Sequence, residues 1–285
     1  MGQAPAGVLS DDRQTEAEPR ELTRNLVTPG TVGLRPGMFG ELVVHLVKRE
    51  IDTTHRMTVL GWAWPLVRQL VQLAVLVFIF GSVLDLGIEH FAVFVFSGLI
   101  AWNWFSNGVG TATGSLLSTR HLLYQPRLPP AVIPIVAVVV PLVDVLMALP
   151  VLLILLQVEA GIPATVLAIP LLVLAQILLM AGIAWLTAAL SVFLRDVPNM
   201  VMVGLNVLFY LTPIFYGLKV VPEQYQGLLD VNPMATIVNS YRAILLGEAL
   251  PGTFAIVYTL VLSIGLIALG YLVFARLQNR FVDNL

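Results

Sequence analysis

Six stretches of this chain are apolar and long enough to cross a lipid bilayer. Lipid offers no hydrogen-bond partners to an exposed backbone, so only helices and closed barrels span it, and about 20 apolar residues in a row indicate a helix. The sequence therefore predicts an all-α integral membrane protein. The six predicted spans are residues 59–84, 91–117, 131–156, 163–194, 200–218 and 254–275.

The composition indicates the same class. Of the 285 residues 58% are hydrophobic and 11% are charged, and the mean hydropathy is +0.90, whereas soluble domains carry about a quarter charged residues. The net charge of -2 and the unclustered basic residues give no indication of nucleic-acid binding. The absence of cysteine excludes disulfides and thiolate chemistry. The four histidines are scattered singly, so no metal site is predicted.

Two segments precede the first span. Residues 1–36 are polar, with mixed charge and several prolines and glycines, and are predicted to be a disordered cytoplasmic tail. In residues 37–58 apolar side chains such as Leu42 and Leu46 recur at helical spacing, while charged side chains such as Lys48 take the other face. This pattern predicts an amphipathic helix in the membrane interface, which serves either as an anchor or as a contact for a partner.

The basic residues are divided unequally between the two sides that the spans define. Most lysines and arginines fall on the side of the two termini, and Lys219 and Arg242 are the only basic residues on the opposite side. By the positive-inside rule both termini are predicted to be cytoplasmic. The predicted organisation is a six-span domain over residues 59–277, followed by a cytoplasmic C-terminal tail over residues 278–285.

The stretch 191–242 is apolar but repeatedly interrupted. Arg195 and Asp196 form a loop motif that separates the fourth span from the fifth, and a segment rich in proline and glycine follows. Asn232 and Pro233 have the pattern that begins a helix, with asparagine as N-cap and proline at the first helical position. Broken helices at membrane depth are stable only where protein or a water-filled pathway covers their backbone. Short re-entrant helices in the wall and mouth of a conduit are therefore predicted before the last span.

The segment between the second and third spans can extend a helix beyond the membrane until prolines turn the chain back. Its surface combines apolar and aromatic side chains with positive charge. Such a helix suits docking into a groove of another protein, although a simple turn at the membrane surface explains the residues equally well. The candidate coupling residues are Arg120, His121, Leu122, Tyr124, Gln125 and Arg127.

Several motifs follow one another in a fixed order. They are VLGWAWPLVRQL in the first span, YQPRLPPAVIP after the second, FLRDVPNM at the end of the fourth and TPIFYGLKVVPEQYQGLLDVNPMATIVNSYRAILLG before the sixth. From residue 42 onward the chain resembles the permease subunits of type-2 ABC exporters, in the branch that exports polysaccharides and polyol phosphates (O-antigen, teichoic acid or cell-wall galactan). Each motif alone is weak, but their register around six spans is specific.

The resemblance implies a homodimer in the bacterial inner membrane, driven by two separate ATPase subunits that bind ATP and Mg, with no cofactor in this chain. It implies a polyprenyl-diphosphate-linked polysaccharide as the substrate, moved out of the cytoplasm. A drug or lipid exporter of the same fold is the alternative. The residues support a separate motor independently, because a P-loop needs a lysine after a glycine pattern and neither Lys48 nor Lys219 follows one.

An ion-coupled carrier is a further alternative, and it rests on Asp144 near the middle of the third span. Carboxylates at this depth are costly and often functional, but a hydrogen bond between helices also explains Asp144, and proton relays usually need several ionisable residues. A membrane-embedded enzyme would need paired acidic side chains on a scaffold, and the Asp11-Asp12 pair lies in the predicted tail.

Aromatic side chains gather in the first, second and fifth spans. Sugar rings have apolar C–H faces that stack on aromatic rings, so a polysaccharide conduit favours such residues, although packing or the lipid interface explains each one singly. As a group these residues are predicted to line the channel: Phe78, Phe80, Trp102, Phe209, Tyr210, Phe215 and Tyr216.

Overall fold

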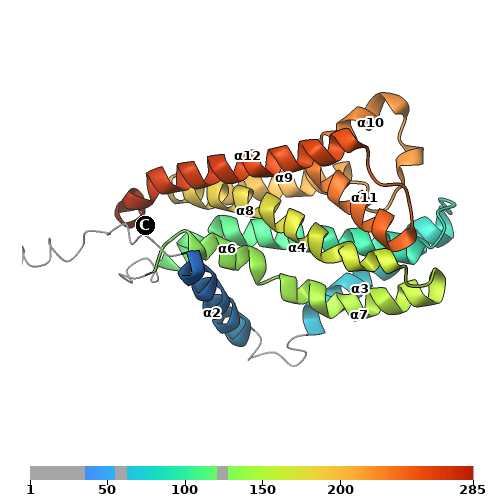
Figure 1. The fold of residues 1–285 in the computed structure, drawn as a ribbon, viewed down its shortest axis with the longest axis horizontal. Coiled ribbons are helices and arrows are strands. Elements are labelled where there is room, and N and C mark those ends of the chain that lie inside the picture. The colour runs from blue at the N-terminus through green and yellow to red at the C-terminus, as the bar shows by residue number, and fades with distance from the viewer. Residues whose placement is uncertain (1–35, 55–62, 121–127, 285) are drawn as a thin grey trace, which may run out of the picture.

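The computed structural model describes residues 36–54, 63–120 and 128–284. Over these residues the chain is helical and contains no strand, which confirms the predicted all-α fold class. Figure 1 shows long helices side by side along one axis, with α2 crossing them at an angle near one end. The predicted disordered tail falls almost wholly outside the described residues and stays a prediction.

Within the described residues, five helical segments are long and apolar enough to cross a membrane, and α9 is a shorter apolar helix. The α-helices are α2 (Pro36–Thr54), α3 (Trp64–Leu76), α4 (Phe91–Ser118), α6 (Val132–Val139), α7 (Leu142–Glu159), α8 (Ile169–Phe193), α9 (Val197–Leu211), α10 (Glu223–Asp230), α11 (Pro233–Leu246), α12 (Thr253–Leu277) and α13 (Phe281–Asn284). Short 3-10 turns cover Ala164–Ala168, Leu218–Val220 and Gln278–Arg280.

Four of the six predicted spans depart from a single straight α-helix. The first continues from α3 into π-helical turns over Val77–Val83. The third is broken at Pro141, between α6 and α7, because proline has no N–H and its ring disrupts the preceding turn. The fourth begins with the 3-10 turn over Ala164–Ala168 before α8. The fifth is predicted to reach residue 218, and this boundary is wrong. Helix α9 ends at Leu211, since the residue before Pro213 is held in extended backbone, and it is only about 22 Å long.

Helix α4 is the centre of the bundle. Over its most apolar stretch of 18 residues 78% of the residues are buried, compared with 11–28% over the corresponding stretches of the other four long spans. It contacts α3, α6, α7, α8, α9 and α11. Phe96 and Leu99 are fully buried, and the Trp104 Nε1–H donates to the Val138 carbonyl at 3.1 Å. The other helices are therefore positioned largely by what they pack against on α4.

Helices α8 and α12 pack backbone to backbone. A Cβ atom added to Gly182 would lie 2.6 Å from both the Ile267 nitrogen and the Leu266 carbonyl carbon, and one added to Gly270 would meet the Gly182 carbonyl oxygen. Small residues let membrane helices approach this closely. The two glycines therefore set the spacing between α8 and α12.

Two short segments pack at the end of the bundle where the C-terminus lies. In α2, Leu42 and Leu46 are half-buried while Lys48 is exposed, which matches the predicted amphipathic pattern, and the helix contacts α6. After α12 the chain folds back, and Phe281 is only 1% exposed, with its ring 5.1 Å from that of Phe274. Residues 278–284 are therefore folded onto the bundle rather than extended from it.

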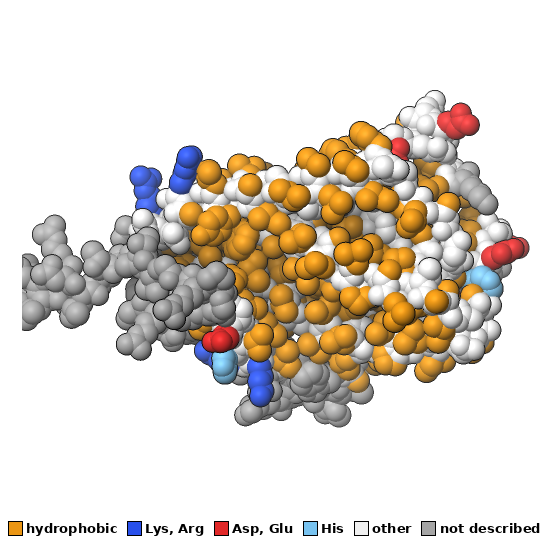
Figure 2. Space-filling model, in the orientation of Figure 1, with side chains coloured by type: hydrophobic (Ala, Val, Ile, Leu, Met, Phe, Trp, Pro, Cys, Tyr) orange, Lys and Arg blue, Asp and Glu red, His pale blue; other side chains and the backbone are white. Residues whose placement is uncertain are grey.

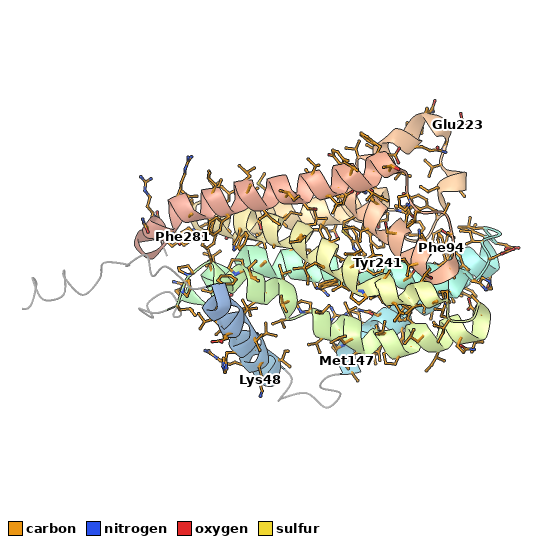
Figure 3. All side chains as sticks on the ribbon, viewed as in Figure 1. Lys48, Phe94, Met147, Glu223, Tyr241 and Phe281 are labelled. Atoms are coloured by element: carbon orange, nitrogen blue, oxygen red, sulfur yellow. The ribbon has the colours of Figure 1, made fainter. Side chains whose placement is uncertain are left out.

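The surface of the bundle agrees with a membrane location. Figure 2 shows that hydrophobic side chains cover the middle of the visible face, while the Lys and Arg side chains on that face lie toward one end. Phe281 lies at that end and Glu223, on α10, at the opposite end (Figure 3). The long axis of the bundle is therefore the direction in which the chain crosses the bilayer.

Candidate functional site

One face of α4 is not covered by the other described helices. Apart from its first two residues and Leu117, every residue of α4 that is not buried is polar or glycine. Steps of three or four place these residues on one side of the helix, and we call them the polar stripe of α4. The stripe consists of Asn103, Ser106, Asn107, Gly110, Thr111, Gly114 and Ser118. Amides and hydroxyls are costly in contact with lipid, so this face must meet water or protein.

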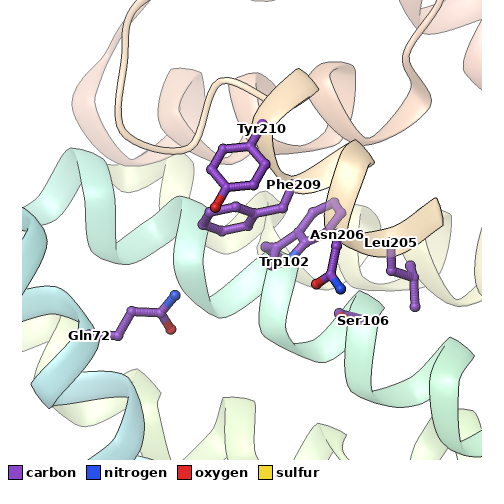
Figure 4. Close-up of a pocket in the computed structure, with 7 residues that line it drawn as sticks. All are labelled: Gln72, Trp102, Ser106, Leu205, Asn206, Phe209 and Tyr210. Carbon is purple, nitrogen blue, oxygen red and sulfur yellow. The ribbon is translucent and has the colours of Figure 1, made fainter. Parts of the chain in front are cut away.

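A cavity of about 340 Å³ opens beside the polar stripe, between α3, α4 and α9 (Figure 4). Its size falls in the range of roughly 300–1,000 Å³ that is usual for ligand pockets. Its lining residues are Gln72 from α3, Trp102 and Ser106 from α4, and Leu205, Asn206, Phe209 and Tyr210 from α9. The cavity thus combines three aromatic side chains with two amides and the hydroxyl groups of Ser106 and Tyr210, and none of these described lining residues is ionisable at neutral pH.

The polar side chains at the cavity are only partly paired. The Asn103 Nδ2 group donates to the Gln72 Oε1 atom at 3.4 Å, which is long for a hydrogen bond. The side chains of Ser106 and Asn206 make no hydrogen bond to any described residue, and Asn206 is exposed. Hydrogen-bonding capacity therefore remains available inside the cavity.

Three of the aromatic residues predicted to line a channel meet at this cavity. Trp102 contacts Phe209 edge to face, with ring centroids 5.7 Å apart. The Phe209 ring in turn lies 5.3 Å from Tyr210 and 6.1 Å from Phe215. The second and fifth predicted spans are thus joined by one aromatic cluster.

The cluster continues toward the end of the bundle that carries α10. Phe215 stacks on Phe80 with ring centroids 4.9 Å apart, and it contacts Tyr216 at 5.3 Å. Phe78 lies outside the cluster, because its side chain is 65% exposed. Six of the seven predicted aromatic residues are therefore contiguous in space, and their role in lining a channel stays a prediction.

Arg242 holds the segment that follows α9. Its side chain is 1% exposed, and its guanidinium donates to three backbone carbonyls: Pro213 at 2.5 Å, Ile214 at 2.7 Å and Phe94 at 3.2 Å. The guanidinium carbon also lies 3.4 Å from the centroid of the Phe94 ring, a cation–π contact. Arg242 thus joins α11 to the first turn of α4 and to the segment that carries Phe215.

Asn232 makes a second connection at the start of α11. Its Oδ1 atom accepts from the backbone N–H groups of Met234 at 3.0 Å and Ala235 at 3.3 Å, which confirms the predicted N-cap. Its Nδ2 group donates to the Leu211 carbonyl at 3.2 Å and to the Thr212 hydroxyl at 3.1 Å. Asn232 at its start and Arg242 near its end therefore hold the buried helix α11 against the end of α9 and the segment that follows it. Helix α10, by contrast, is mostly exposed.

Comparison with known proteins places this architecture in a family. Residues 41–246, well over half of the chain, match the family model described as ABC-2 type transporter. The chain belongs to the ABC-2 type transporter family. Members of this family are membrane transport proteins rather than enzymes.

Relatives of this ABC-2 transporter chain match it over nearly their whole length. It is 27% identical over 254 residues to the O-antigen export system permease protein RfbA of Klebsiella pneumoniae, a match that covers 87% of this chain and 96% of that protein. It is 29% identical over 247 residues to RfbA of Myxococcus xanthus, covering 86% of this chain and 95% of that protein. The similarity therefore extends over the whole bundle rather than over a single motif.

The predicted coupling and loop residues of this ABC-2 transporter are only partly described. Helix α4 ends at Ser118, and Arg120 just beyond it is exposed. Arg195 and Asp196 form the exposed turn between α8 and α9, and a cytoplasmic location of this turn stays a prediction. The remaining coupling residues, His121, Leu122, Tyr124, Gln125 and Arg127, lie outside the described residues, so a coupling helix stays a prediction.

Asp144 has a different setting from the one its sequence position suggests. It lies in the first turn of α7, directly after the break at Pro141, and its backbone N–H donates to the Pro141 carbonyl at 3.1 Å. A carboxylate is favoured at a helix N-terminus by the helix dipole. The helix dipole at the start of α7 therefore accounts for a carboxylate at this position of the third span. Among the described residues, no group of three His, Asp or Glu side chains forms a metal site.

Proposed function

We propose that this chain is the permease subunit of an ABC exporter that moves a lipid-linked polysaccharide of the O-antigen kind out of the cytoplasm. It acts as a homodimer in the bacterial inner membrane, with both termini cytoplasmic. Two separate ATPase subunits bind ATP and Mg²⁺ and supply the energy. The names of the relatives from Klebsiella pneumoniae and Myxococcus xanthus support the choice of substrate.

The observation that carries the proposal is the polar stripe of α4 beside the aromatic cluster. Polar groups on a membrane-spanning helix indicate a hydrated pathway, because water or protein must satisfy them. Aromatic rings in such a pathway offer flat surfaces to the C–H faces of sugars, and amides offer partners to their hydroxyl groups. A pathway for drugs or lipids would instead favour an apolar wall.

The homodimer is supported by what flanks the polar stripe. Helices α3 and α9 both contact α4, and α3 exposes Val71 and Val75 while α9 exposes Met202 and Val203, so the two helices beside the polar stripe carry exposed apolar surface. A second copy facing the stripe would close the hydrated pathway with these apolar surfaces as the seal. In this arrangement lipid never contacts the amides of α4.

Coupling to the ATPase subunits is supported by the position of Arg120. It follows the end of α4 that points toward the end of the bundle with α2 and the C-terminus (Figure 1). In the proposed orientation this end is cytoplasmic. The ATPase subunits dock there, at Arg120 and the segment that continues to residue 127.

The test is co-expression of this chain with an ATPase subunit in a strain that lacks its own polysaccharide permease. We expect a complex with two copies of each subunit, and polymer on the cell surface only when both are present. The purified chain alone is expected to hydrolyse no ATP. Robust ATP turnover by this polypeptide alone, or polymer that stays inside cells containing the intact complex, would contradict the proposal.

A double substitution tests the coupling segment. Arg120→Ala with Tyr124→Ala is expected to leave the permease inserted but to lower copurification of the ATPase, since both side chains belong to the proposed docking surface. Arg276→Ala, an exposed arginine in the last turn of α12, is the matched control. Normal ATPase binding and export by the double variant would show that the segment is only a turn.

A further inference from the structure

We propose that the cavity between α3, α4 and α9 is a binding subsite for one uncharged sugar unit of the exported polymer. The amides of Gln72 and Asn206 and the hydroxyl of Ser106 bind the hydroxyl groups of the sugar, and the aromatic wall faces its ring. This inference rests on the proposed function. Beyond the proposed function, it specifies the chemical class of the ligand, an uncharged sugar unit, and the residues that contact this unit inside the membrane.

The position of the cavity places the subsite within the membrane. Trp102 and Ser106 lie near the middle of α4, a helix long enough to cross the bilayer. The cavity volume of about 340 Å³ suits a single sugar unit together with a few water molecules. The subsite therefore contacts the polymer during its passage rather than at its entry.

The hydrogen-bonding groups of the cavity match those of a sugar. Each amide offers one carbonyl acceptor and two N–H donors, and a sugar hydroxyl both donates and accepts. Asn206 and Ser106 have no partner among the described residues, and Gln72 is held only by the 3.4 Å bond from Asn103. Sugar hydroxyl groups satisfy these side chains at little cost, because only one long bond has to be exchanged.

The walls of the cavity favour an uncharged ligand. None of its described lining residues is lysine or arginine, and Arg68 of α3 lies one helical turn before Gln72 without lining it. A phosphate or carboxylate group moved into such a site would lose its hydration without gaining a cation. The subsite therefore binds neutral sugar units in preference to polyol phosphates.

Two leucine substitutions test the contacts in the complete exporter. Asn206→Leu and Gln72→Leu keep similar volume but remove the amide, so each is expected to lower the export rate of a lipid-linked mannose polymer about 3- to 10-fold. Gln157→Leu is the matched control, because Gln157 is an exposed amide of α7 that does not line the cavity.

A labelling experiment measures occupancy of the cavity directly. The natural chain has no cysteine, so Leu205→Cys places a single thiol in the cavity wall. We expect mannose polymer stalled in the complex with vanadate to protect this thiol from a small maleimide at least about 5-fold. The protection is expected to fall when Asn206→Leu is added. Asn206→Ser keeps a polar group with a shorter reach and is expected to retain part of the protection. It replaces Asn206→Leu in this experiment if the leucine variant does not insert.

The outcomes separate the subsite from the proposed function. Failure of the wild-type complex to export any glycan overturns the proposed function. Normal export with equal labelling of the thiol in the presence and absence of stalled polymer overturns the subsite alone. Export by both leucine variants at the wild-type rate also overturns the subsite and leaves the proposed function intact. Equal protection by a glycerol-phosphate polymer overturns the assignment to uncharged sugar units.

Discussion

Replacement of Arg242 by methionine should release the segment after α9 from the bundle. Methionine is an unbranched, flexible side chain that fills the space of the arginine stem, but it is shorter and donates no hydrogen bond. The carbonyl groups of Pro213 and Ile214 then lose donors at 2.5 Å and 2.7 Å. The contact of the guanidinium with the ring of Phe94 is lost as well.

The expected cost follows from these contacts. A buried carbonyl left without a partner costs about 1–3 kcal/mol, so two of them cost about 2–6 kcal/mol. Part of this is offset, because methionine removes a buried charge that has to be desolvated. Hydrogen bonds within membrane proteins also often contribute only about 0.6 kcal/mol each. We therefore expect the opening of this segment to become easier by about 2–4 kcal/mol.

Cysteine labelling can measure this opening, because the natural chain contains no cysteine. Ile214 is fully buried, so a cysteine at this position should react slowly with a membrane-impermeant maleimide added outside intact cells. Since about 1.4 kcal/mol corresponds to a factor of ten, Arg242→Met should raise the labelling rate by at least about 30-fold. Arg242→Lys should have an intermediate effect, because an ammonium keeps the charge but lacks the planar fork that reaches several carbonyls.

The control is a cysteine at Val220, which is 58% exposed and should react equally in all three backgrounds. An unchanged labelling rate at position 214 in the Arg242→Met variant, with normal labelling at position 220, would refute the reasoning. It would mean that the segment is held by apolar packing and by Asn232, and that the guanidinium bonds are dispensable.

Three further predictions concern the bundle itself. Gly270→Leu should drive α8 and α12 apart and lower the free energy of unfolding in detergent by about 1–3 kcal/mol. Gly265→Leu should have little effect, because nothing lies within 4 Å of a Cβ atom added at Gly265. Asn232→Ala should cost about 1 kcal/mol through the lost N-cap, in addition to the lost Nδ2 bonds. In the same unfolding assay Asn232→Asp should recover the N-cap but not the bond to the Leu211 carbonyl, because a carboxylate has no N–H to donate. Asp144→Asn should retain export, because asparagine keeps size and hydrogen bonding. Complete loss of export with normal ATPase binding would favour ion coupling instead.

Much of the fold could be predicted because the bilayer restricts the possible structures so strongly. Apolar runs of about 20 residues leave helices as the simplest solution, and local signals such as the N-cap at Asn232 mark where they begin. The errors occur where an apolar run contains proline. Hydropathy alone does not register the break at Pro141 or the end of α9 before Pro213, because the side chains on both sides remain apolar.

The candidate site was predictable in its aromatic half only. Aromatic residues are conspicuous in an apolar sequence, and Trp102, Phe209 and Phe215 indeed meet in space. The amide of Asn206 is not conspicuous, because a single asparagine in an apolar helix is also explained by a bond to a neighbouring helix. Only the packing of α9 against α4 reveals that this side chain faces a cavity.

Arg242 illustrates a different limit. The sequence marks it as an unusual residue, since it is one of two basic residues on the side that is otherwise predicted to lack them. Sequence position cannot identify its partners, because they are backbone carbonyls from segments 28 and 148 residues away. Carbonyl groups are present at every residue, so no pattern of side chains points to them.

The second span contains the signal that best connects fold and function. It is the least apolar of the five long spans and yet the most deeply buried. A helix that faces lipid needs apolar side chains all around, whereas a helix enclosed by protein can present a polar face to a pathway without contact with lipid. The recurrence of Asn103, Asn107 and Gly110 at helical spacing marks that face within the sequence. The least hydrophobic span of a polytopic chain is therefore the one to test first for contact with the substrate.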